Sequence, residues 1–330
     1  MSVAGEAREV VAPEPSEPGS GGQAPAAVRA LRRLVVNPLI VKDGLSRMRS
    51  WRAPAVIAVY LVMLGLFAWL AFSVQLGDGG LQRFYGFARV GSTVFTALAV
   101  VQLALVCLFT PGVAAGAISG ERERQTLDVL LVSCVPSFSI VWGKLVASVA
   151  FIVLLILAAL PLFAAVFLLG GIDASQFVVA QLVTVTTALT TGAVSLFLSA
   201  LFRRTLAATV VAYGITFAAT AGTWIVGTIL TSAAAAQLRT GPPPAHPLLW
   251  FNPIHAILTA LQGGSGSVPG LGRVTTVYYI ATGQTGPNAP AIEPWHLTVV
   301  AQLVVVVLGV IGTVWLLRER RGIFRGSAPS

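Results

Sequence analysis

Charged residues are scarce in this chain. Aspartate, glutamate, lysine and arginine make up 10% of its 330 residues and hydrophobic residues make up 56%, and the mean hydropathy is +0.85. A soluble domain carries about 25% charged residues. So few charges cannot cover a water-facing surface, and we expect lipid to cover much of the chain. The net charge of +9 does not indicate nucleic-acid binding, because the basic residues lie beside apolar runs and form no separate basic domain.

Cysteine and histidine are scarce as well. The chain has two cysteines, Cys107 inside an apolar run and Cys134 in a predicted loop, and two thiols so placed make no disulfide framework. Its three histidines, His246, His255 and His296, fall in or beside one predicted loop without the spacing of a metal site. We interpret them as solvated loop residues. The sequence therefore predicts no metal and no cofactor bound by this chain.

Long apolar runs without charge are what the chain does contain. A helix needs about 20 apolar residues to cross the hydrocarbon core of a bilayer. Six runs are long enough to form transmembrane helices: Ala53–Val74, Val90–Ala114, Leu145–Leu169, Phe177–Phe202, Leu206–Thr231 and Leu297–Leu317. A seventh run, Val129–Trp142, is shorter and is interrupted by Pro136 and serines, so it is predicted to lie at the membrane interface.

Basic residues are distributed unevenly between the predicted loops. Cytoplasmic loops carry an excess of Lys and Arg. Alternate loops and the two tails hold 17 of the 21 basic residues, which supports the span count and places both termini in the cytoplasm. The first 28 residues are rich in Pro, Gly, Ala and Glu, so residues 1–36 are predicted to be a disordered cytoplasmic tail, and no signal peptide is recognisable.

The predicted spans contain no Asp, Glu, Lys, Arg or His. Ion-coupled carriers usually need ionisable groups at depth, and acid–base chemistry inside the bilayer would need them as well. A proton-coupled transporter and a membrane-embedded hydrolase are therefore disfavoured. An ATP site is absent too, because neither Lys42 nor Lys144 stands in a GxxxxGK[ST] pattern. An ATPase that drives this chain must be another chain.

The most informative segment is the predicted cytoplasmic loop 115–144. On a helix, its apolar and charged side chains fall on opposite faces. The apolar face holds Leu127, Leu130, Leu131 and Cys134, and the other face holds Glu121, Arg124, Gln125 and Asp128. We interpret the segment as a short amphipathic helix on the inner membrane surface. From the helix pattern alone, an ordinary solvated loop with an interfacial helix is an equal alternative.

The same loop resembles a stretch of ABC-2 type permeases, the membrane subunits of ATP-binding-cassette exporters. The family pattern has an Ile, a Glu-Arg-Glu run, Thr-Leu, a Leu pair, a Pro and a closing Gly-Lys. This chain matches it at Ile118, Glu121, Arg122, Glu123, Thr126, Leu127, Leu130, Leu131, Pro136, Gly143 and Lys144. It departs at Gln125, where the family often has Gly and where a glutamine would stiffen the start of the helix.

In that family the loop is a coupling helix that docks on an ATPase. The resemblance implies that this chain contacts such a partner through Glu121, Arg122, Glu123, Arg124, Thr126, Leu127 and Asp128. It also implies ATP and Mg bound by the partner, a second permease subunit, identical or different, and a place in the cytoplasmic membrane of a bacterium. Membrane lipid is a further partner, and no nucleic acid is expected.

Two flanking segments agree with the resemblance. Residues 37–52 form a basic amphipathic pattern that starts at Asn37 and Pro38, a helix N-cap and first helical position. They are similar to the family's elbow helix, although a plain positive-inside anchor fits the physics equally well. The final run, Leu297–Leu317, looks like the family's last helix, and residues 318–330 are predicted to be a cytoplasmic tail.

The longest connection is the predicted external loop 232–296. Asn252 and Pro253 start a short apolar helix within it, and Trp250 and Phe251 precede that helix at interface depth. The segment resembles the short re-entrant helices that this family places before its last span. The alternative is a small surface helix lying on lipid.

Uncharged polar side chains form stripes on the predicted spans. The candidates for lining a substrate path are Gln102, Thr187, Thr191, Thr216, Thr220 and Thr223. Helix packing is the favoured alternative, because hydroxylated residues let membrane helices approach and hydrogen-bond. The lack of charge favours an amphipathic or lipid-like cargo. Pro161 is expected to kink the third span.

Together these features predict an all-α integral membrane protein with six transmembrane helices, an elbow helix, a cytoplasmic coupling helix and a re-entrant or interfacial external segment. The leading hypothesis is a permease subunit of an ABC exporter that has no enzymatic residues of its own. Two other classes stay open. A lipid-modifying membrane enzyme would need clustered Asp, Glu, His or Ser, and a membrane scaffold would leave the charged loop without a specific role.

Overall fold

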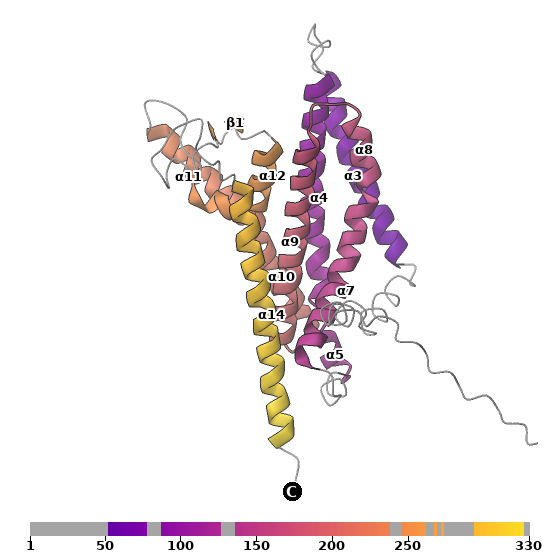
Figure 1. Ribbon diagram of the computed structural model, residues 1–330, viewed down its shortest axis with the longest axis vertical. Helices are drawn as coiled ribbons and strands as arrows, with labels where there is room; N and C mark the ends of the chain where they lie inside the picture. Colours follow the sequence, from indigo (N-terminus) through magenta and orange to yellow (C-terminus); the bar gives the residue numbers. More distant parts are fainter. Residues whose placement is uncertain are drawn as a thin grey trace, which may run out of the picture. The chain divides into compact units, whose positions relative to one another are not determined.

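Six helical segments of the described chain are long and apolar enough to cross a membrane, as the sequence predicts (Figure 1). The computed structural model describes residues 52–77, 87–126, 136–237, 246–261, 267–268, 272–273 and 294–326. The candidate spans are Pro54–Val74, Val90–Glu123, Ser137–Phe167, Ala174–Leu201, Thr205–Ala233 and Pro294–Glu319. The predicted tail 1–36 and the predicted elbow helix 37–52 lie outside the described residues, apart from Arg52.

The elements of the described chain are almost all helical. In chain order they are α3 (Arg52–Gly77), α4 (Phe87–Ala114), α5 (Ser119–Glu123), α7 (Ser137–Ala158), α8 (Leu160–Phe167), α9 (Ala174–Leu201), α10 (Thr205–Phe217), the π-helix η2 (Ala218–Gly222), α11 (Thr223–Gln237), the 3₁₀-helix η3 (Pro247–Phe251), α12 (Pro253–Leu261), β1 (Ser267–Val268), β2 (Gly272–Arg273) and α14 (Pro294–Gly326). The two short strands pair antiparallel.

Proline and glycine set the breaks around the third span. The third span is interrupted just before Pro161, where a kink was expected, because α7 ends at Ala158 and α8 begins at Leu160. Proline has no N–H to continue the helical bonds. Gly170 and Gly171 then turn the chain into α9 with φ of +79° and +85°, a backbone conformation that glycine adopts without steric cost.

Two boundaries differ from the prediction. The segment Val129–Trp142 was expected at the interface and the third span at Leu145, but α7 already begins at Ser137 and buries Ile140 and Val141. Lys144 therefore lies within the helix. At the other end, α14 continues beyond Leu317 to Gly326, because the Arg and Glu residues after the apolar run are good helix formers.

α9 is the central helix of the unit formed by residues 37–330, and it packs against α4, α7, α10, α12 and α14. Near one end of the bundle, the rings of Phe95, Phe163 and Phe177 meet edge to face with centroids 5.1 to 6.1 Å apart, an arrangement that aromatic pairs prefer. This aromatic contact joins α4, α8 and α9.

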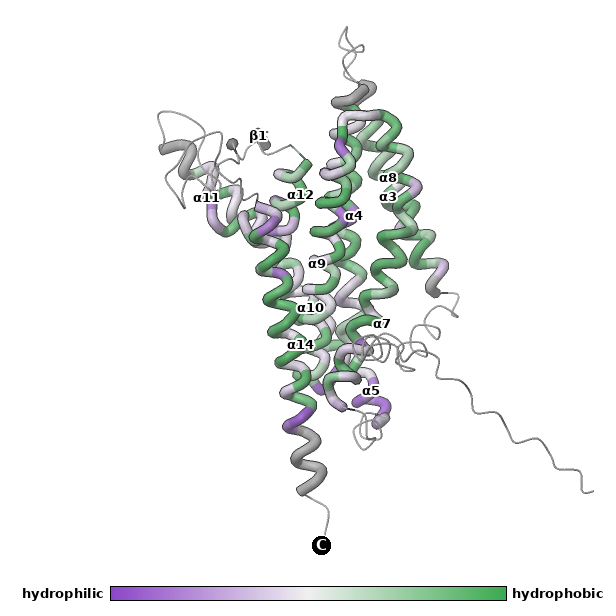
Figure 2. Tube along the Cα trace, in the orientation of Figure 1, coloured by the Kyte–Doolittle hydropathy of each residue, from purple (hydrophilic) through white to green (hydrophobic). Residues whose placement is uncertain are grey.

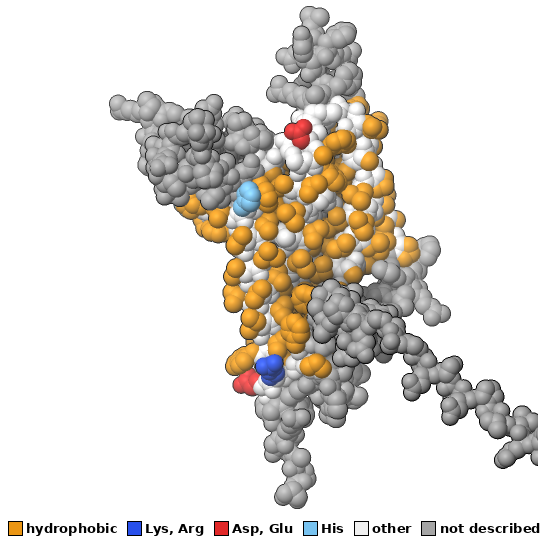
Figure 3. All heavy atoms as spheres, viewed as in Figure 1, with side chains coloured by type: hydrophobic (Ala, Val, Ile, Leu, Met, Phe, Trp, Pro, Cys, Tyr) orange, Lys and Arg blue, Asp and Glu red, His pale blue; other side chains and the backbone are white. Residues whose placement is uncertain are grey.

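Large apolar side chains also cover the outside of the bundle. Trp69 of α3 is 70% exposed and Leu308 of α14 is 62% exposed. Hydrophobic residues run along the spans, whereas hydrophilic residues gather around α5 (Figure 2). On the face in Figure 3 the charged side chains lie at the two ends, with a hydrophobic surface between them. Such a band suits the hydrocarbon core of a bilayer.

Candidate functional site

The loop after the second span turns back onto the bundle within a few residues. α4 ends at Ala114, and α5 is a single short helix that ends at Glu123. Arg124 and Gln125 form the turn that follows. Gln125 has φ +59°, in the left-handed region that favours glycine. This backbone explains why a glycine would fit at position 125.

The predicted amphipathic helix is therefore wrong at its start. The chain leaves the helix at Arg124, so Glu121 and Arg124 do not share a continuous helix with the residues that follow. The expectation that a glutamine at position 125 stiffens a helix start stays a prediction, because the described part of the loop ends at Thr126. Leu127 and Asp128, with the rest of residues 127–135, lie outside the described residues.

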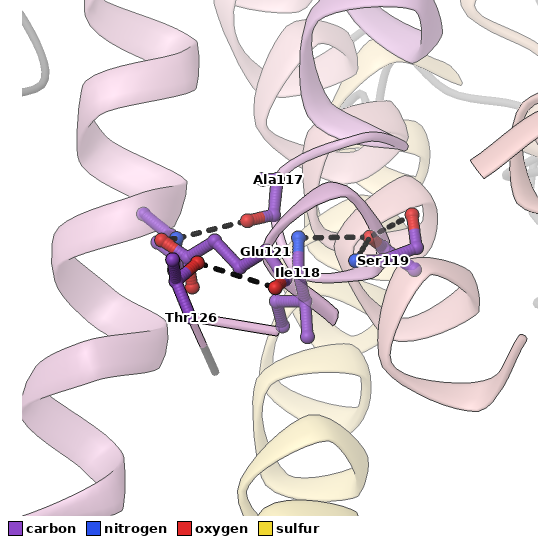
Figure 4. Close-up of polar contacts among 7 residues, drawn as sticks. Ala117, Ile118, Ser119, Glu121 and Thr126 are labelled. Carbon is purple, nitrogen blue, oxygen red and sulfur yellow. Dashed lines mark hydrogen bonds and ion pairs between the residues drawn. The ribbon is translucent and has the colours of Figure 1, made fainter. Parts of the chain in front are cut away.

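Lys144 of α7 anchors this loop from one side. Its Nζ lies 2.6 Å from Glu121 Oε1 and donates a 2.8 Å hydrogen bond to the carbonyl oxygen of Ala117 (Figure 4). The lysine side chain is 4% exposed and the glutamate 29% exposed. A charge so buried is tolerated because it is paired and hydrogen-bonded. The ion pair joins the third span to the loop.

Ser199 of α9 anchors the loop from the other side. Its Oγ accepts hydrogen bonds from the backbone N–H groups of Ile118 and Ser119, at 3.0 and 2.9 Å. Figure 4 shows Glu121 and Ser119 directed to different neighbouring helices. The loop thus sits between α7 and α9, bonded to both.

The next two charged residues bind the turn between the fourth and fifth spans. Arg122 donates to the carbonyl oxygens of Phe202 and Ala200, at 2.8 and 3.0 Å, at the C-terminus of α9. Glu123 accepts from the N–H of Thr205 at 2.7 Å and from its hydroxyl at 2.9 Å, at the N-terminus of α10. Each charge has the sign that the helix dipole at that end favours.

The structure therefore divides the predicted coupling residues into two groups. Glu121, Arg122 and Glu123 bind other parts of this chain. Arg124 and Thr126 are exposed at the end of the described loop. We name residues 124–126 the loop tip.

Three of the predicted path residues lie inside the bundle. Gln102 is fully buried and exchanges amide hydrogen bonds of 3.3 and 3.2 Å with Gln181 of α9. Thr187 accepts a 2.8 Å bond from Gln302 of α14, and Thr191 donates to the carbonyl oxygen of Thr187. These contacts join α9 to α4 and α14.

Two other candidates, Thr216 and Thr220, line a cavity of about 240 Å³ between α4, the fifth span and α12. Its wall is otherwise apolar apart from Tyr213 and Cys107. The remaining lining residues are Val100, Leu103, Ala104, Leu108, Phe217, Ala221 and Ile254. Of the three polar candidates on the fifth span, these two threonines therefore line the cavity.

Thr223, the last candidate, contacts α12 instead of the cavity. Its Oγ1 accepts a 2.6 Å hydrogen bond from Asn252 Nδ2. α12 is buried along most of its length, including Ala256 and Ile257, and it packs against α4, α9 and α14. The predicted short helix therefore exists, and it is packed inside the helix bundle and not on its surface.

The prediction of solvated loop histidines is wrong for His255. This side chain in α12 is fully buried, neither ring nitrogen has a hydrogen-bond partner, and it lies beside Trp224. Burial lowers the pKa of His255 from 6.5 to about 4, because an apolar site disfavours the imidazolium. His246 caps η3 by accepting from Leu248 N–H, and His296 is exposed.

The bonds of Ser199 and Thr205 to the loop, the bonds of Asn252 to the fifth span and the burial of His255 were not predicted from the sequence. The only local signal was the Asn-Pro helix start at residue 252. Among the residues that the structure describes, no three His, Cys, Asp or Glu side chains are grouped as metal ligands.

Two comparisons with known proteins bear on the chain. A family model described as ABC-2 family transporter protein matches residues 38–320. No curated protein matches the sequence.

Proposed function

The chain belongs to the ABC-2 family of transporter proteins, and from that premise we propose that it is the permease subunit of an ATP-driven exporter. The α5 end would face the cytoplasm and the α12 end the outside, as the distribution of Lys and Arg favours. In a bacterium this places the protein in the cytoplasmic membrane, with both termini inside.

The observation that carries the proposal is the anchored loop. Three consecutive charged residues, Glu121, Arg122 and Glu123, connect it to the third, fourth and fifth spans. A force applied to the loop tip would therefore act on three spans together. Since the tip is exposed and polar, it supplies a surface for a second protein.

We assign that surface to an ATPase subunit. The loop tip would contact the ATPase together with Leu127 and Asp128, which follow it in the sequence. ATP and Mg would bind to the ATPase, because the sequence contains no P-loop. A second permease subunit, identical or different, would complete the transporter. In this assignment Glu121, Arg122 and Glu123 position the loop and do not dock.

The cavity supports a route for cargo. Thr216 and Thr220 supply hydroxyl groups to a wall that is mostly apolar, and both lie on the fifth span, whose N-terminus Glu123 caps. A wall of this composition suits an amphipathic or lipid-like molecule better than a small ion. The path would then include Thr216 and Thr220, with Gln102, Thr187 and Thr191 as packing residues.

The test is purification of the chain together with candidate ATPase chains encoded beside it, followed by ATPase assays in lipid. Arg124→Glu should lower the ATPase activity of the complex at least about tenfold, equivalent to about 1.4 kcal/mol of docking energy. Arg318→Glu is the matched control, because Arg318 is exposed near the end of the last span. The permease assignment fails if no nucleotide-binding chain co-purifies, or if Arg124→Glu leaves ATP-driven transport intact.

A further inference from the structure

Asn252 joins the fifth span to α12 with both ends of its amide. Nδ2 donates to the carbonyl oxygen of Thr220 and to Thr223 Oγ1, each at 2.6 Å. Oδ1 accepts from the N–H groups of Ile254 and His255, at 2.8 and 3.3 Å. The residue is 1% exposed. One side chain therefore caps α12 and also binds the backbone of η2.

The segment that Asn252 binds is a π-helix inside the fifth span. η2 covers Ala218–Gly222, with the sequence Ala-Ala-Thr-Ala-Gly, and none of its residues is buried. Short π-helical segments often occur at functional sites in helices. Packing of its own small side chains does not impose this geometry on η2. The Asn252 bond to Thr220 is a contact that does constrain it.

The same two parts contribute side chains to the wall of the cavity. Thr220 and Ala221 come from η2, and Ile254 comes from α12. An α-helix advances about 100° per residue, since it has 3.6 residues per turn. A change between π-type and α-type bonding at η2 would therefore turn α11 relative to α10 and redirect the cavity wall.

Beyond η2, the fifth span is attached to the segment before α12. Thr231 Oγ1 accepts a 3.1 Å bond from His246 N–H. At Gly227 a Cβ would lie 2.6 Å from Leu249 Cδ2, so the absence of a side chain permits the contact. α11, η3 and α12 are thus held together, and η2 is the irregular segment between them and α10.

We propose that Asn252 is a positioning residue that holds η2 in its π form, and that η2 is the joint at which the fifth span changes shape as the cavity opens or closes. The first part of the proposal, that Asn252 holds η2, concerns the isolated chain alone. The second part, that η2 is a joint, rests on the proposed transport function.

The first experiment measures amide hydrogen exchange of the full chain in lipid nanodiscs. Asn252→Asp keeps an oxygen to cap α12 and removes both N–H donors. Exchange in residues 216–226 should rise about tenfold, because the opening free energy of the segment falls with the loss of both hydrogen bonds that Nδ2 donates. Thr231→Val, the control, removes a neighbouring bond outside η2 and should leave that exchange unchanged. Equal exchange in Asn252→Asp and wild type, or an equal rise in the control, would overturn the first part.

If Asn252→Asp does not fold, Thr223→Val tests the same contact. It removes one acceptor while keeping the side-chain shape, and the expected rise is about threefold. No rise in Thr223→Val, with Asn252→Asp unfolded, would also overturn the first part.

The second experiment uses the unmodified complex with its ATPase, without nucleotide and trapped with Mg-ATP and vanadate. Exchange at η2 should change by about fivefold or more on trapping, while the middle of α9 stays constant. A response in the loop tip without one at η2 would overturn the joint and leave the transporter intact. If no ATPase binds, the proposed function fails, and the joint fails with it.

Discussion

Replacing Lys144 with methionine tests whether the loop is held by a buried charge pair. The substitution keeps the length of the side chain and removes its ammonium. It deletes the 2.6 Å ion pair with Glu121 and the 2.8 Å hydrogen bond to the Ala117 carbonyl oxygen. Glu121 then carries a negative charge without its partner, on a side chain that is only 29% exposed.

The size of the loss follows from this burial. Removing one partner of a fully buried pair costs about 3–5 kcal/mol. Water reaches Glu121 in part, so we expect Lys144→Met to lower the free energy of unfolding by about 3 kcal/mol, at the low end of that range. Glu121→Gln replaces the charged partner of the Lys144 ammonium with a neutral amide and leaves its hydrogen bond to the Ala117 carbonyl oxygen. This substitution should lower the free energy of unfolding by about 2 kcal/mol. The double variant should cost about 3 kcal/mol, which gives a coupling energy of about 2 kcal/mol.

The assay is reversible unfolding in mixed micelles, followed by tryptophan fluorescence for the wild type and the three variants. Arg124→Met is the control, because Arg124 is exposed in the same loop, and it should change stability by less than about 0.5 kcal/mol. Losses in Lys144→Met and Glu121→Gln that add within about 0.5 kcal/mol would refute the buried-pair argument.

Three further predictions use the same unfolding assay. Gln125→Gly should stabilise the protein by about 0.5–1 kcal/mol, because the cost of φ +59° that it removes exceeds the conformational entropy that a glycine adds to the unfolded chain. A loss of stability would contradict the turn. Gly227→Ala should cost about 1–3 kcal/mol, because its Cβ would meet Leu249 at 2.6 Å, and Leu249→Ala should restore part of the loss. Burial lowers the pKa of His255 to about 4, so the unfolded chain binds the proton at a higher pH than the folded chain does. The free energy of unfolding should therefore be at its full value above pH 6.5. It should decrease by about 3 kcal/mol in total between pH 6.5 and pH 4. His255→Phe should remove that dependence, and an unchanged slope would show that another group causes it.

The spans could be predicted because the bilayer imposes a local requirement. Each needs about 20 consecutive apolar residues and satisfies its backbone within one helix, so each of the six apolar runs corresponds to one candidate span of the structure. The break at Pro161 and the helix that starts after Asn252 were also visible, because proline acts on its own segment. The start of α7 at Ser137 was not predicted, because Lys144 interrupts the apolar sequence there. Lys144 is accommodated in the helix by Glu121 and Ala117.

The sequence by itself determined that this chain is a six-helix membrane protein of the ABC-2 family, since apolar length and a motif are written in consecutive residues. Only the tertiary structure showed which groups of this chain the motif's charges bind. Arg122 and Glu123 look like docking residues in the sequence, yet their partners, Phe202 and Thr205, belong to a distant turn. Burial of His255 and the four bonds of Asn252 depend in the same way on which helices come together. The partner of a side chain is a group that lies close to it in space. A pattern of consecutive residues does not show which distant residues the fold brings together.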